Sequence, residues 1–177
     1  MLDKKRLQPF ILTIVVVLLD QITKLIIIKT IPAYDWDSFI NVIGDDFFRI
    51  IHVKNLGVAF SMGSGLPDIF RFVLMKILPL LVLAWVGWMV YHREKEGLTV
   101  FQSWLLAGVI GGGLGNLIDR FFRPDGVVDF LDVKFYGLFG LERWPTFNVA
   151  DAAVVVTVIL LLISLLCQAV KKKDSHE

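Results

Sequence analysis

Apolar residues gather in four long stretches of the chain, and more polar stretches separate them. The apolar stretches cover residues 9–31, 69–91, 99–121 and 148–170, and each has about the 20 residues that a membrane-spanning helix requires. The composition agrees with this pattern, because 56% of the residues are hydrophobic and the mean hydropathy is +0.70. The sequence therefore predicts an α-helical membrane protein, in which residues 1–177 form one integral membrane domain with four transmembrane helices.

The two longer polar stretches, residues 32–68 and 122–147, are predicted to lie outside the membrane on one side. In the first, the run from Phe47 to Val53 is dominated by β-branched and aromatic residues, which favours a small β element over a linker. In the second, a β-like run follows the turn sequence Pro124-Asp125-Gly126. The predicted fold thus combines four helices with a small β element and a second loop.

The distribution of lysine and arginine predicts the orientation of the chain. Eight of these residues lie at the N-terminus, in the 92–98 loop and at the C-terminus, against five in the two longer polar stretches. Because cytoplasmic segments are enriched in positive charge, both termini are expected in the cytoplasm. The β element and the second loop then face outward.

The first two apolar stretches contain signals for where helices begin and bend. The basic start and the apolar run Phe10 to Leu19 are also typical of a cleaved secretory signal, but no small-residue cleavage site follows, so the first helix is expected to remain. In the second stretch, Asp68 is predicted as the N-cap and Pro79 is predicted to kink the helix. Arg71 and Lys76 are expected to extend towards the near interface.

Charge and cysteine content exclude several classes of function. The net charge of +1 leaves no basic face for nucleic acid once the residues that flank the membrane are assigned. The single cysteine, Cys167, excludes an intrachain disulfide, and its place in the last apolar stretch indicates a packing residue.

Polar residues occur at the ends of two apolar stretches, where they are costly to bury. Asn116, Asp119 and Arg120 have a helical i, i+3, i+4 spacing at the end of the third stretch. Asn148 and Asp151 open the fourth stretch at i, i+3. The predicted topology places both clusters at the outer face, and ionisable residues in such positions are usually functional.

Asp129 lies between these clusters in the second loop and is expected to meet Asp151 in space. Asp132 competes for this role, and a solvated strand carboxylate is an alternative for either residue. Two carboxylates held close in a poorly hydrated site share a proton, so one can act as a base and the other as an acid. Such a pair can activate water against an amide carbonyl. Because a helix N-terminus favours a negative charge, we expect Asp151 to be the charged base and Asp129 the protonated partner.

Other chemistries have less support in the sequence. There is no G-x-S-x-G motif, the three histidines are scattered, and neither H-E-x-x-H nor C-x-x-C occurs. No metal ion and no other cofactor is therefore expected.

Several polar residues also have structural interpretations that the sequence leaves open. Asp20 and Lys24, spaced i, i+4, can neutralise each other, and Asp119 with Arg120 can form an interfacial ion pair. The remaining alternatives are a capping box formed by Asn148 and Asp151, turn chemistry for Asn55 in Asn55-Leu56-Gly57, and close helix packing for Gly108, Gly111, Gly112, Gly113 and Gly115.

Five motifs in order along the chain resemble those of the signal peptidase II, or lipoprotein signal peptidase, family. They are D-Q-I-T-K at 20–24, N-L-G-V-A-F at 55–60, G-G-L-G-N-L-I-D-R at 112–120, V-V-D-F at 127–130 and F-N-V-A-D-A-A at 147–153. The resemblance implies a multi-pass aspartyl peptidase of the bacterial inner membrane with an extracytoplasmic β-cradle. It further implies that prolipoproteins are cut just before a diacylglyceryl-modified cysteine.

The resemblance also implies roles for particular residues and partners. Asp129 and Asp151 correspond to the catalytic pair, and the supporting or substrate-binding residues are Asp20, Lys24, Asn55, Gly57, Asn116, Asp119, Arg120 and Asn148. The expected partners are diacylglyceryl-modified prolipoproteins, membrane lipid and globomycin-type inhibitors, and a monomer is expected. Residues 134–144 depart from the family pattern, because this connection is longer than usual.

A small transporter or proton channel is the alternative from another class, because buried carboxylates also line ion paths. Such a path needs polar residues at successive depths, whereas Val154 to Leu166 and Trp104 to Ile110 are almost wholly apolar. A scaffold without chemistry would not need two facing carboxylates. The distance between the carboxylates distinguishes these possibilities.

Overall fold

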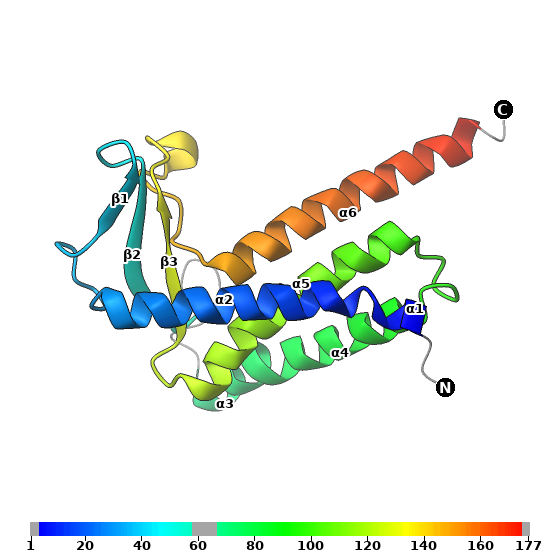
Figure 1. Ribbon diagram of the computed structural model, residues 1–177, viewed down its shortest axis with the longest axis horizontal. Coiled ribbons are helices and arrows are strands. Elements are labelled where there is room, and N and C mark those ends of the chain that lie inside the picture. Colours follow the sequence, from blue (N-terminus) through cyan, green and yellow to red (C-terminus); the bar gives the residue numbers. More distant parts are fainter. Residues whose placement is uncertain (1–3, 58–66, 175–177) are drawn as a thin grey trace.

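The computed structural model describes residues 4–57 and 67–174. In this part of the chain, four helical segments are long and apolar enough to cross a membrane, namely 4–30, 68–91, 100–122 and 149–172 (Figure 1). They are built from α1 (Lys4–Leu7), α2 (Phe10–Thr30), α3 (Asp68–Phe72), the π-helical segment η2 (Val73–Ile77), α4 (Leu78–Tyr91), α5 (Val100–Phe122) and α6 (Val149–Asp174). The predicted class of helical membrane protein is confirmed.

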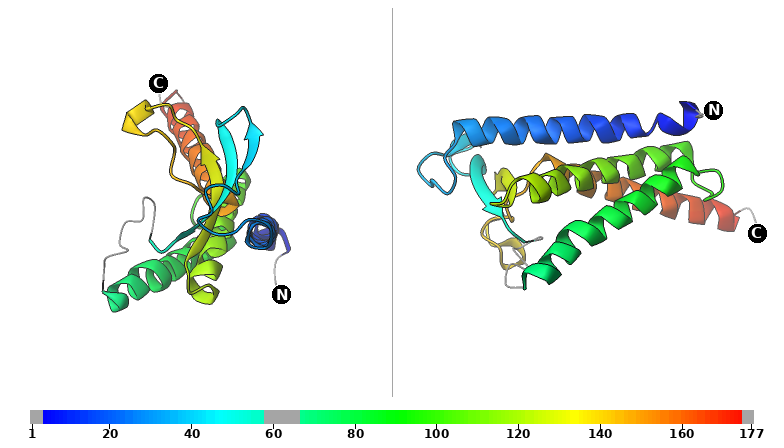
Figure 2. Two further views of the ribbon diagram at one scale, coloured as in Figure 1. Left: turned by 90° about the vertical axis from the view of Figure 1, so that its left-hand side faces the viewer. Right: turned by 90° about the horizontal axis from the view of Figure 1, so that it is seen from below.

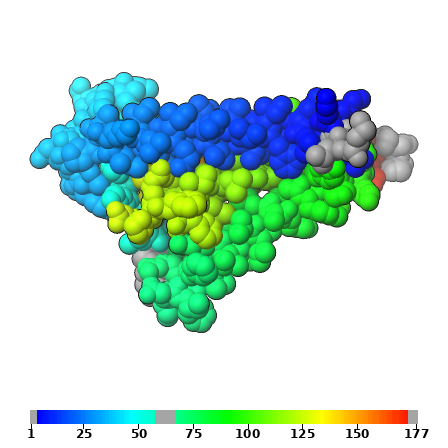
Figure 3. Space-filling model, turned by 60° about the horizontal axis from the view of Figure 1, so that its bottom comes forward, coloured from blue at the N-terminus to red at the C-terminus, as the bar shows by residue number. Residues whose placement is uncertain are grey.

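Helix α5 lies at the centre of the helical part, and the other helices pack around it (Figure 2). In its most apolar stretch of 18 residues, 56% of α5 is buried inside the protein, whereas the corresponding share is 6% for α6 and 11% for the 68–91 segment. In the space-filling view, α2 lies directly against the end of α5, while the α3 end stands away from α2 (Figure 3). The outward faces of α2, α4 and α6 carry exposed apolar side chains, as lipid-facing surfaces do.

Glycines on α5 allow this close packing. A Cβ on Gly112 would lie 2.4 Å from the carbonyl oxygen of Ala150 on α6, and a Cβ on Gly115 would lie 2.7 Å from the Asp20 carboxylate on α2. Both distances are shorter than the contacts that Cβ atoms make with other heavy atoms in proteins. The packing interpretation of the glycine-rich stretch is therefore correct at these positions.

The start of the second span differs from the sequence-based prediction. Asp68 is the first residue of α3 rather than its N-cap, because Pro67 with an extended ψ of 146° occupies the cap position. The Asp68 carboxylate instead accepts a hydrogen bond of 2.5 Å from Arg71. Near Pro79, the helix widens into η2, which ends two residues before the proline. This irregularity lies where a proline cannot donate the usual helical hydrogen bond.

A three-stranded antiparallel sheet forms at one end of the helical part, in the order β1 (Ile40–Ile43), β2 (Phe48–Asn55) and β3 (Val127–Val133). The two polar stretches of the sequence thus join in one sheet, because β3 pairs with β2. The sheet packs on the end of α2 through Ile27, Ile31, Val128 and Phe130. The Nδ1 atom of His52 lies 2.7 Å from the Ile31 carbonyl oxygen and adds a polar contact.

Candidate active site

Three fully buried charged side chains connect α2 with α5 close to the sheet. Lys24 Nζ lies 2.8 Å from Asp20 Oδ2 and 2.9 Å from Asp119 Oδ2, and all three side chains have 0% exposure. Lys24 also donates to Asn116 Oδ1 at 3.0 Å. The predicted Asp20–Lys24 pair therefore exists, and it extends into a larger network that also holds Asp119 and Asn116.

Asp119 contacts Arg123 and not Arg120 in the described structure. Its Oδ1 atom accepts from Nη1 of Arg123, the residue that follows α5, and its Oδ2 atom accepts from the backbone N–H of Val128 at 3.1 Å. The alternative of an Asp119–Arg120 ion pair is therefore not the one that the structure adopts, because neighbouring residues on a helix point about 100° apart. Arg120 turns towards the sheet instead, where its Nη2 atom lies 3.4 Å from the Gly57 carbonyl oxygen.

Asp20 also holds the beginning of α6. Its Oδ1 atom accepts a hydrogen bond of 3.0 Å from the backbone N–H of Ala150, which lies in the first turn of α6. The first N–H groups of a helix lack partners within the helix, so a carboxylate from α2 satisfies one of them. Asp20 therefore fixes the position at which the fourth span starts.

Asn148 caps α6 and joins the two candidate catalytic carboxylates. Its Oδ1 atom accepts from the Asp151 N–H at 3.0 Å, and its own N–H donates to Asp151 Oδ2 at 3.1 Å, which is the predicted capping box. Its Nδ2 group donates to Asp129 Oδ1 at 2.7 Å and to Asn116 Oδ1 at 3.0 Å. One side chain thus contacts β3, α5 and the first turn of α6.

Asp129 and Asp151 line the same cavity, which has a volume of about 1030 Å³. Asp151 Oδ1 accepts from Asn116 Nδ2 at 2.7 Å, and Asp129 Oδ2 accepts from Asn55 Nδ2 at 3.2 Å. Asn55 also accepts from the Gly57 N–H at 2.9 Å, so it both forms the predicted turn and contacts Asp129. The structure therefore brings together two carboxylates that the sequence separates by 22 residues.

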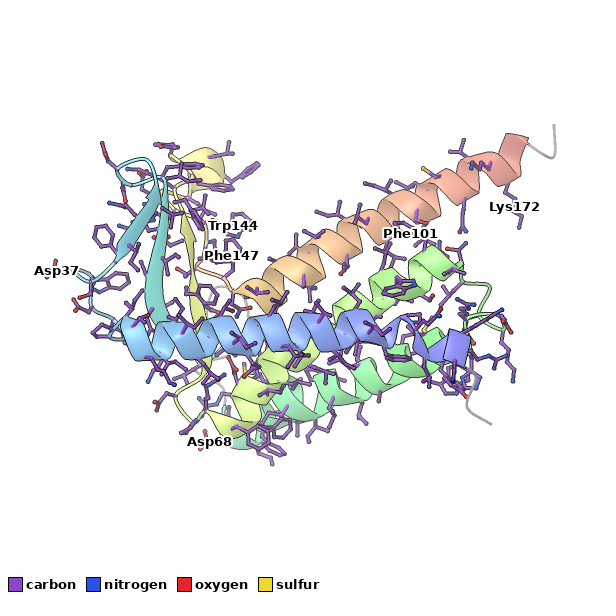
Figure 4. All side chains as sticks on the ribbon, viewed as in Figure 1. Asp37, Asp68, Phe101, Trp144, Phe147 and Lys172 are labelled. Carbon is purple, nitrogen blue, oxygen red and sulfur yellow. The ribbon has the colours of Figure 1, made fainter. Side chains whose placement is uncertain are left out.

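The cavity has a polar end at these carboxylates and an apolar part between α4 and α6. Its apolar lining includes Pro79, Val82, Leu83 and residues 154–156. Trp144 and Phe147, on the segment that joins the sheet to α6, also line it and lie on the side of the sheet nearest the helices (Figure 4). A ligand with a polar and a long apolar part would suit this shape.

Burial and the neighbouring charge determine the protonation of Asp129. Burial raises the pKa of its carboxyl most, the charge of Asp151 raises it further, and the pKa reaches about 7. Hydrogen bonds from Asn55 and Asn148 and the charge of Lys24 oppose this rise. The side chain is only 3% exposed, which is the cause of the raised pKa. Because this pKa is about 7, a large fraction of the Asp129 carboxyl groups keep the proton at neutral pH.

Asp132 is excluded as the partner of Asp151 by its position. It lies three residues after Asp129 on β3, so it points to the opposite face of the strand. There, its carboxylate accepts hydrogen bonds from Arg49 at 2.6 Å and from Arg143 at 2.8 Å. It belongs to an ionic cluster on the sheet and does not line the cavity.

Two further polar residues belong to the site, although their local sequence gave them no predicted role. Gln21 donates to the Asp20 and Asp119 carboxylates and to the Gly115 carbonyl oxygen, each at 3.0 Å, and Arg123 pairs with Asp119. The available signals were the place of Gln21 inside D-Q-I-T-K and the i, i+4 spacing of Arg123 from Asp119. Residues 58–60 of the N-L-G-V-A-F motif lie outside the described residues.

Among the described residues, no three His, Cys, Asp or Glu side chains are grouped so that they could hold a metal ion. What the arrangement offers is a pair of carboxyl groups with amide donors on both and with cations nearby. Such an arrangement can transfer protons to and from a bound molecule.

Comparison with known proteins matches the chain to one family over most of its length. The family model described as signal peptidase (SPase) II matches residues 12–167. The chain is 46% identical to a lipoprotein signal peptidase of Treponema denticola, covering 93% of this chain and 92% of that protein. It is 44% identical to the same enzyme of Treponema pallidum, with 94% and 87% covered.

Solved structures are similar as well. A bacterial membrane enzyme determined by the in meso method at 2.3 Å resolution superposes with a TM-score of 0.75 and 29% identity, covering 93% of this chain and 91% of that one. A second such structure, at 1.9 Å resolution, gives a TM-score of 0.70 at the same identity and covers 90% and 92%. With its four apolar helices, its buried acidic site and these relatives, the chain belongs to the signal peptidase II family.

Proposed function

We propose that this protein is a lipoprotein signal peptidase that works as an aspartic endopeptidase. Family membership makes it a peptidase of the bacterial inner membrane, and its relatives are lipoprotein signal peptidases. The observation that carries the aspartic mechanism is the arrangement of Asp129 and Asp151 on one cavity, with Asn148 contacting both. The alternative of a transporter or proton channel does not fit this family.

In the proposed mechanism, the two carboxyl groups divide the roles of base and acid. Asp151 lies in the first turn of α6, where the positive end of the helix dipole stabilises negative charge. It accepts a proton from a water molecule as the water oxygen bonds to the carbonyl carbon of the scissile peptide. Asp129, which is buried and protonated, donates a hydrogen bond to the carbonyl oxygen. The proton held by Asp151 then passes to the leaving nitrogen as the C–N bond breaks.

The surrounding residues are proposed to position the pair and to balance its charge. Asn116 and Asn55 each donate to one of the two carboxylates, which limits their rotation. Lys24 and Arg120 supply positive charge near the pair, and Asp20 and Asp119 hold Lys24 in place. Gly57 offers its carbonyl oxygen to Arg120.

The proposed substrate is a prolipoprotein that is cut just before a diacylglyceryl-modified cysteine. The apolar part of the cavity, between α4 and α6, would accept the acyl chains, and the carboxylates would meet the scissile bond at the outer interface. Both termini are proposed to be cytoplasmic, and the sheet and the active site to lie at the outer face. A globomycin-type inhibitor would occupy the same cavity, and the enzyme would act as a monomer on substrate within membrane lipid.

Cleavage of a synthetic prolipoprotein peptide tests this proposal. Asp129→Asn and Asp151→Asn should each abolish turnover of the diacylated peptide, while both proteins remain folded and inserted. Asp132→Asn is the matched control, because Asp132 is equally buried on the same strand but does not line the cavity, and it should retain turnover. Unmodified peptide should not be cut, and globomycin should inhibit the wild type. Turnover by either Asn variant of the pair would remove that residue from the mechanism.

A further inference from the structure

The segment between β3 and the approach to α6 exposes large apolar side chains. We refer to residues 135–144 as the aromatic hairpin. Tyr136 is 68% exposed, Leu138 is 54% exposed and Phe139 is 82% exposed, although all three belong to one short turn. Single exposed apolar residues are common on proteins, but a contiguous group of this kind usually marks a contact surface.

Backbone hydrogen bonds close the aromatic hairpin, and the Tyr136 ring, although exposed, also lies against the sheet, 6.3 Å from the Phe47 ring and 5.5 Å from Lys134 Nζ. The N–H groups of Phe135 and Tyr136 donate to the Glu142 carbonyl oxygen, and the Gly137 N–H donates to that of Leu141. Tyr136 and Phe139 have positive φ values of 50° and 55°. Such values are unfavourable for residues with a Cβ, so surrounding contacts must hold them. A flexible surface loop would not need to maintain them.

Charged residues fasten the base of the hairpin to the sheet. The backbones of Lys134 and Arg143 pair in an isolated antiparallel β-bridge. The side chain of Lys134 forms an ion pair with Asp46, with Nζ 2.8 Å from Oδ2. Arg143 contacts Asp46 and Asp132, and Asp132 also binds Arg49. The Phe135 and Trp144 rings add a contact with centroids 5.0 Å apart. The hairpin thus has an apolar tip on a rigid, charged base.

The position of the hairpin relates it to the membrane. Only three residues separate Trp144 from Asn148, the cap of α6, so its base lies within about 14 Å of the start of a membrane span. In Figure 1 the yellow turn lies at the top of the sheet, on the side towards α6. Trp144 and Phe147 line the cavity together with residues 154–156 of α6. Apolar surface therefore continues from Trp144, at the end of the hairpin, to residues 154–156 of α6.

We propose that the aromatic hairpin inserts Tyr136, Leu138 and Phe139 into the headgroup and upper acyl region of the leaflet where α6 begins. Tyrosine favours the headgroup region, because its ring is apolar and its hydroxyl is polar, whereas leucine and phenylalanine favour the acyl region. The hairpin then anchors the sheet, and with it the strand that carries Asp129, at a fixed height on the bilayer. This contact is independent of the peptidase chemistry.

The charges at the base of the hairpin indicate whether the hairpin binds lipid through charge or through apolar insertion. The cluster contains three cations and three anions, namely Arg49, Lys134, Arg143, Asp46, Asp132 and Glu142. Because these charges balance, the base offers no net attraction to anionic headgroups. Apolar insertion, and not electrostatic binding, should therefore hold the hairpin on the membrane.

Spin labels report whether the hairpin meets lipid. Cys167 is the single cysteine, so Cys167→Ser provides a background for single labels in the full chain. Nitroxides would be attached at Phe139→Cys and, separately, at Leu138→Cys in phosphatidylcholine proteoliposomes. Asp37→Cys, at the end of the molecule that carries the sheet in Figure 4, is the water reference, and Ile159→Cys, on the exposed apolar face of α6, is the lipid reference. Accessibility to oxygen and to a water-soluble nickel chelate is then compared.

The expected result is that both hairpin labels are several-fold less accessible to nickel than the label at 37, and more accessible to oxygen. Adding anionic lipid should leave these values unchanged. Nickel accessibility equal to that at 37 would show that the hairpin faces water and would overturn the inference. Protection from nickel that requires anionic lipid would overturn the inference in favour of electrostatic binding. Dipolar broadening between labels on two copies would overturn it in favour of contact between copies. The label at Leu138 decides if the change at Phe139 disturbs folding.

Discussion

Asp129 is the residue whose protonation should control both activity and stability. Its pKa of about 7 means that the proposed acid loses its proton as the pH rises through neutrality. The ratio kcat/KM for a diacylated peptide should therefore fall about tenfold for each pH unit well above 7. A pH profile of the wild type in detergent measures this. A profile that stays flat to pH 9 would show that Asp129 does not act as the acid.

The same pKa predicts how stability depends on pH. The folded state holds the Asp129 proton more tightly than the unfolded chain, whose ordinary pKa is 3.8, so the contribution of this group to stability is greatest at low pH. It should be lost as the pH rises from about 4 to about 7, by up to roughly 4 kcal/mol. Asp129→Asn removes this loss, so its gain in thermal midpoint over the wild type should be larger at pH 8 than at pH 5. An equal gain at both values would contradict the prediction.

Lys24 compensates two buried carboxylates, so its removal should cost more than a typical substitution. Lys24→Met would leave Asp20 and Asp119 without their shared cation at 0% exposure, and the expected loss is about 3–5 kcal/mol. Lys54→Met is a suitable control, since Lys54 pairs with the exposed Asp125 and should contribute less than about 1 kcal/mol. Thermal unfolding in detergent compares the two variants. Similar midpoints would show that the buried network is not essential for stability.

At the scale of elements, the contact of α5 with α6 depends on the absence of a side chain at Gly112. Gly112→Ala would place a Cβ 2.4 Å from the Ala150 carbonyl oxygen, so it should push the start of α6 away and destabilise the protein by about 1–3 kcal/mol. Gly87→Ala on α4 is the matched control, because the nearest atoms would lie at 3.9 Å. It should be neutral or slightly stabilising, because alanine favours a helix. Equal thermal midpoints for the two variants would contradict the packing argument.

The elements themselves show how far local pattern extends. The helices begin and end within a few residues of the predicted spans, and β2 covers most of the predicted Phe47 to Val53 run. Hydropathy and β propensity determine such features within a short window. The pairing of β3 with β2 was not predicted, because it joins residues more than 70 positions apart. The error at Asp68 has a local cause, since Pro67 already occupies the cap.

At the scale of the whole molecule, the proposed orientation can be tested with single cysteines. In the Cys167→Ser background, Asp37→Cys should react with a membrane-impermeant maleimide in intact spheroplasts, because it lies in the loop proposed to face outward. Glu96→Cys, in the loop between α4 and α5, should react only after the membrane is permeabilised. The opposite pattern would reverse the orientation and place the candidate site at the cytoplasmic face.

The sequence alone determined the four membrane spans, the turn before β3, the capping box at α6 and the residue types available for chemistry. These features depend on neighbours within one or two turns of the chain. Only the tertiary structure decided that Asp129 and not Asp132 shares the cavity with Asp151, that Asp119 pairs with Lys24 and Arg123, and that Asp20 holds the start of α6 across 130 positions. The physical reason is that a buried charge is stable only beside whichever partner the packing of helices and sheet brings within about 3 Å, and local sequence does not encode that distance.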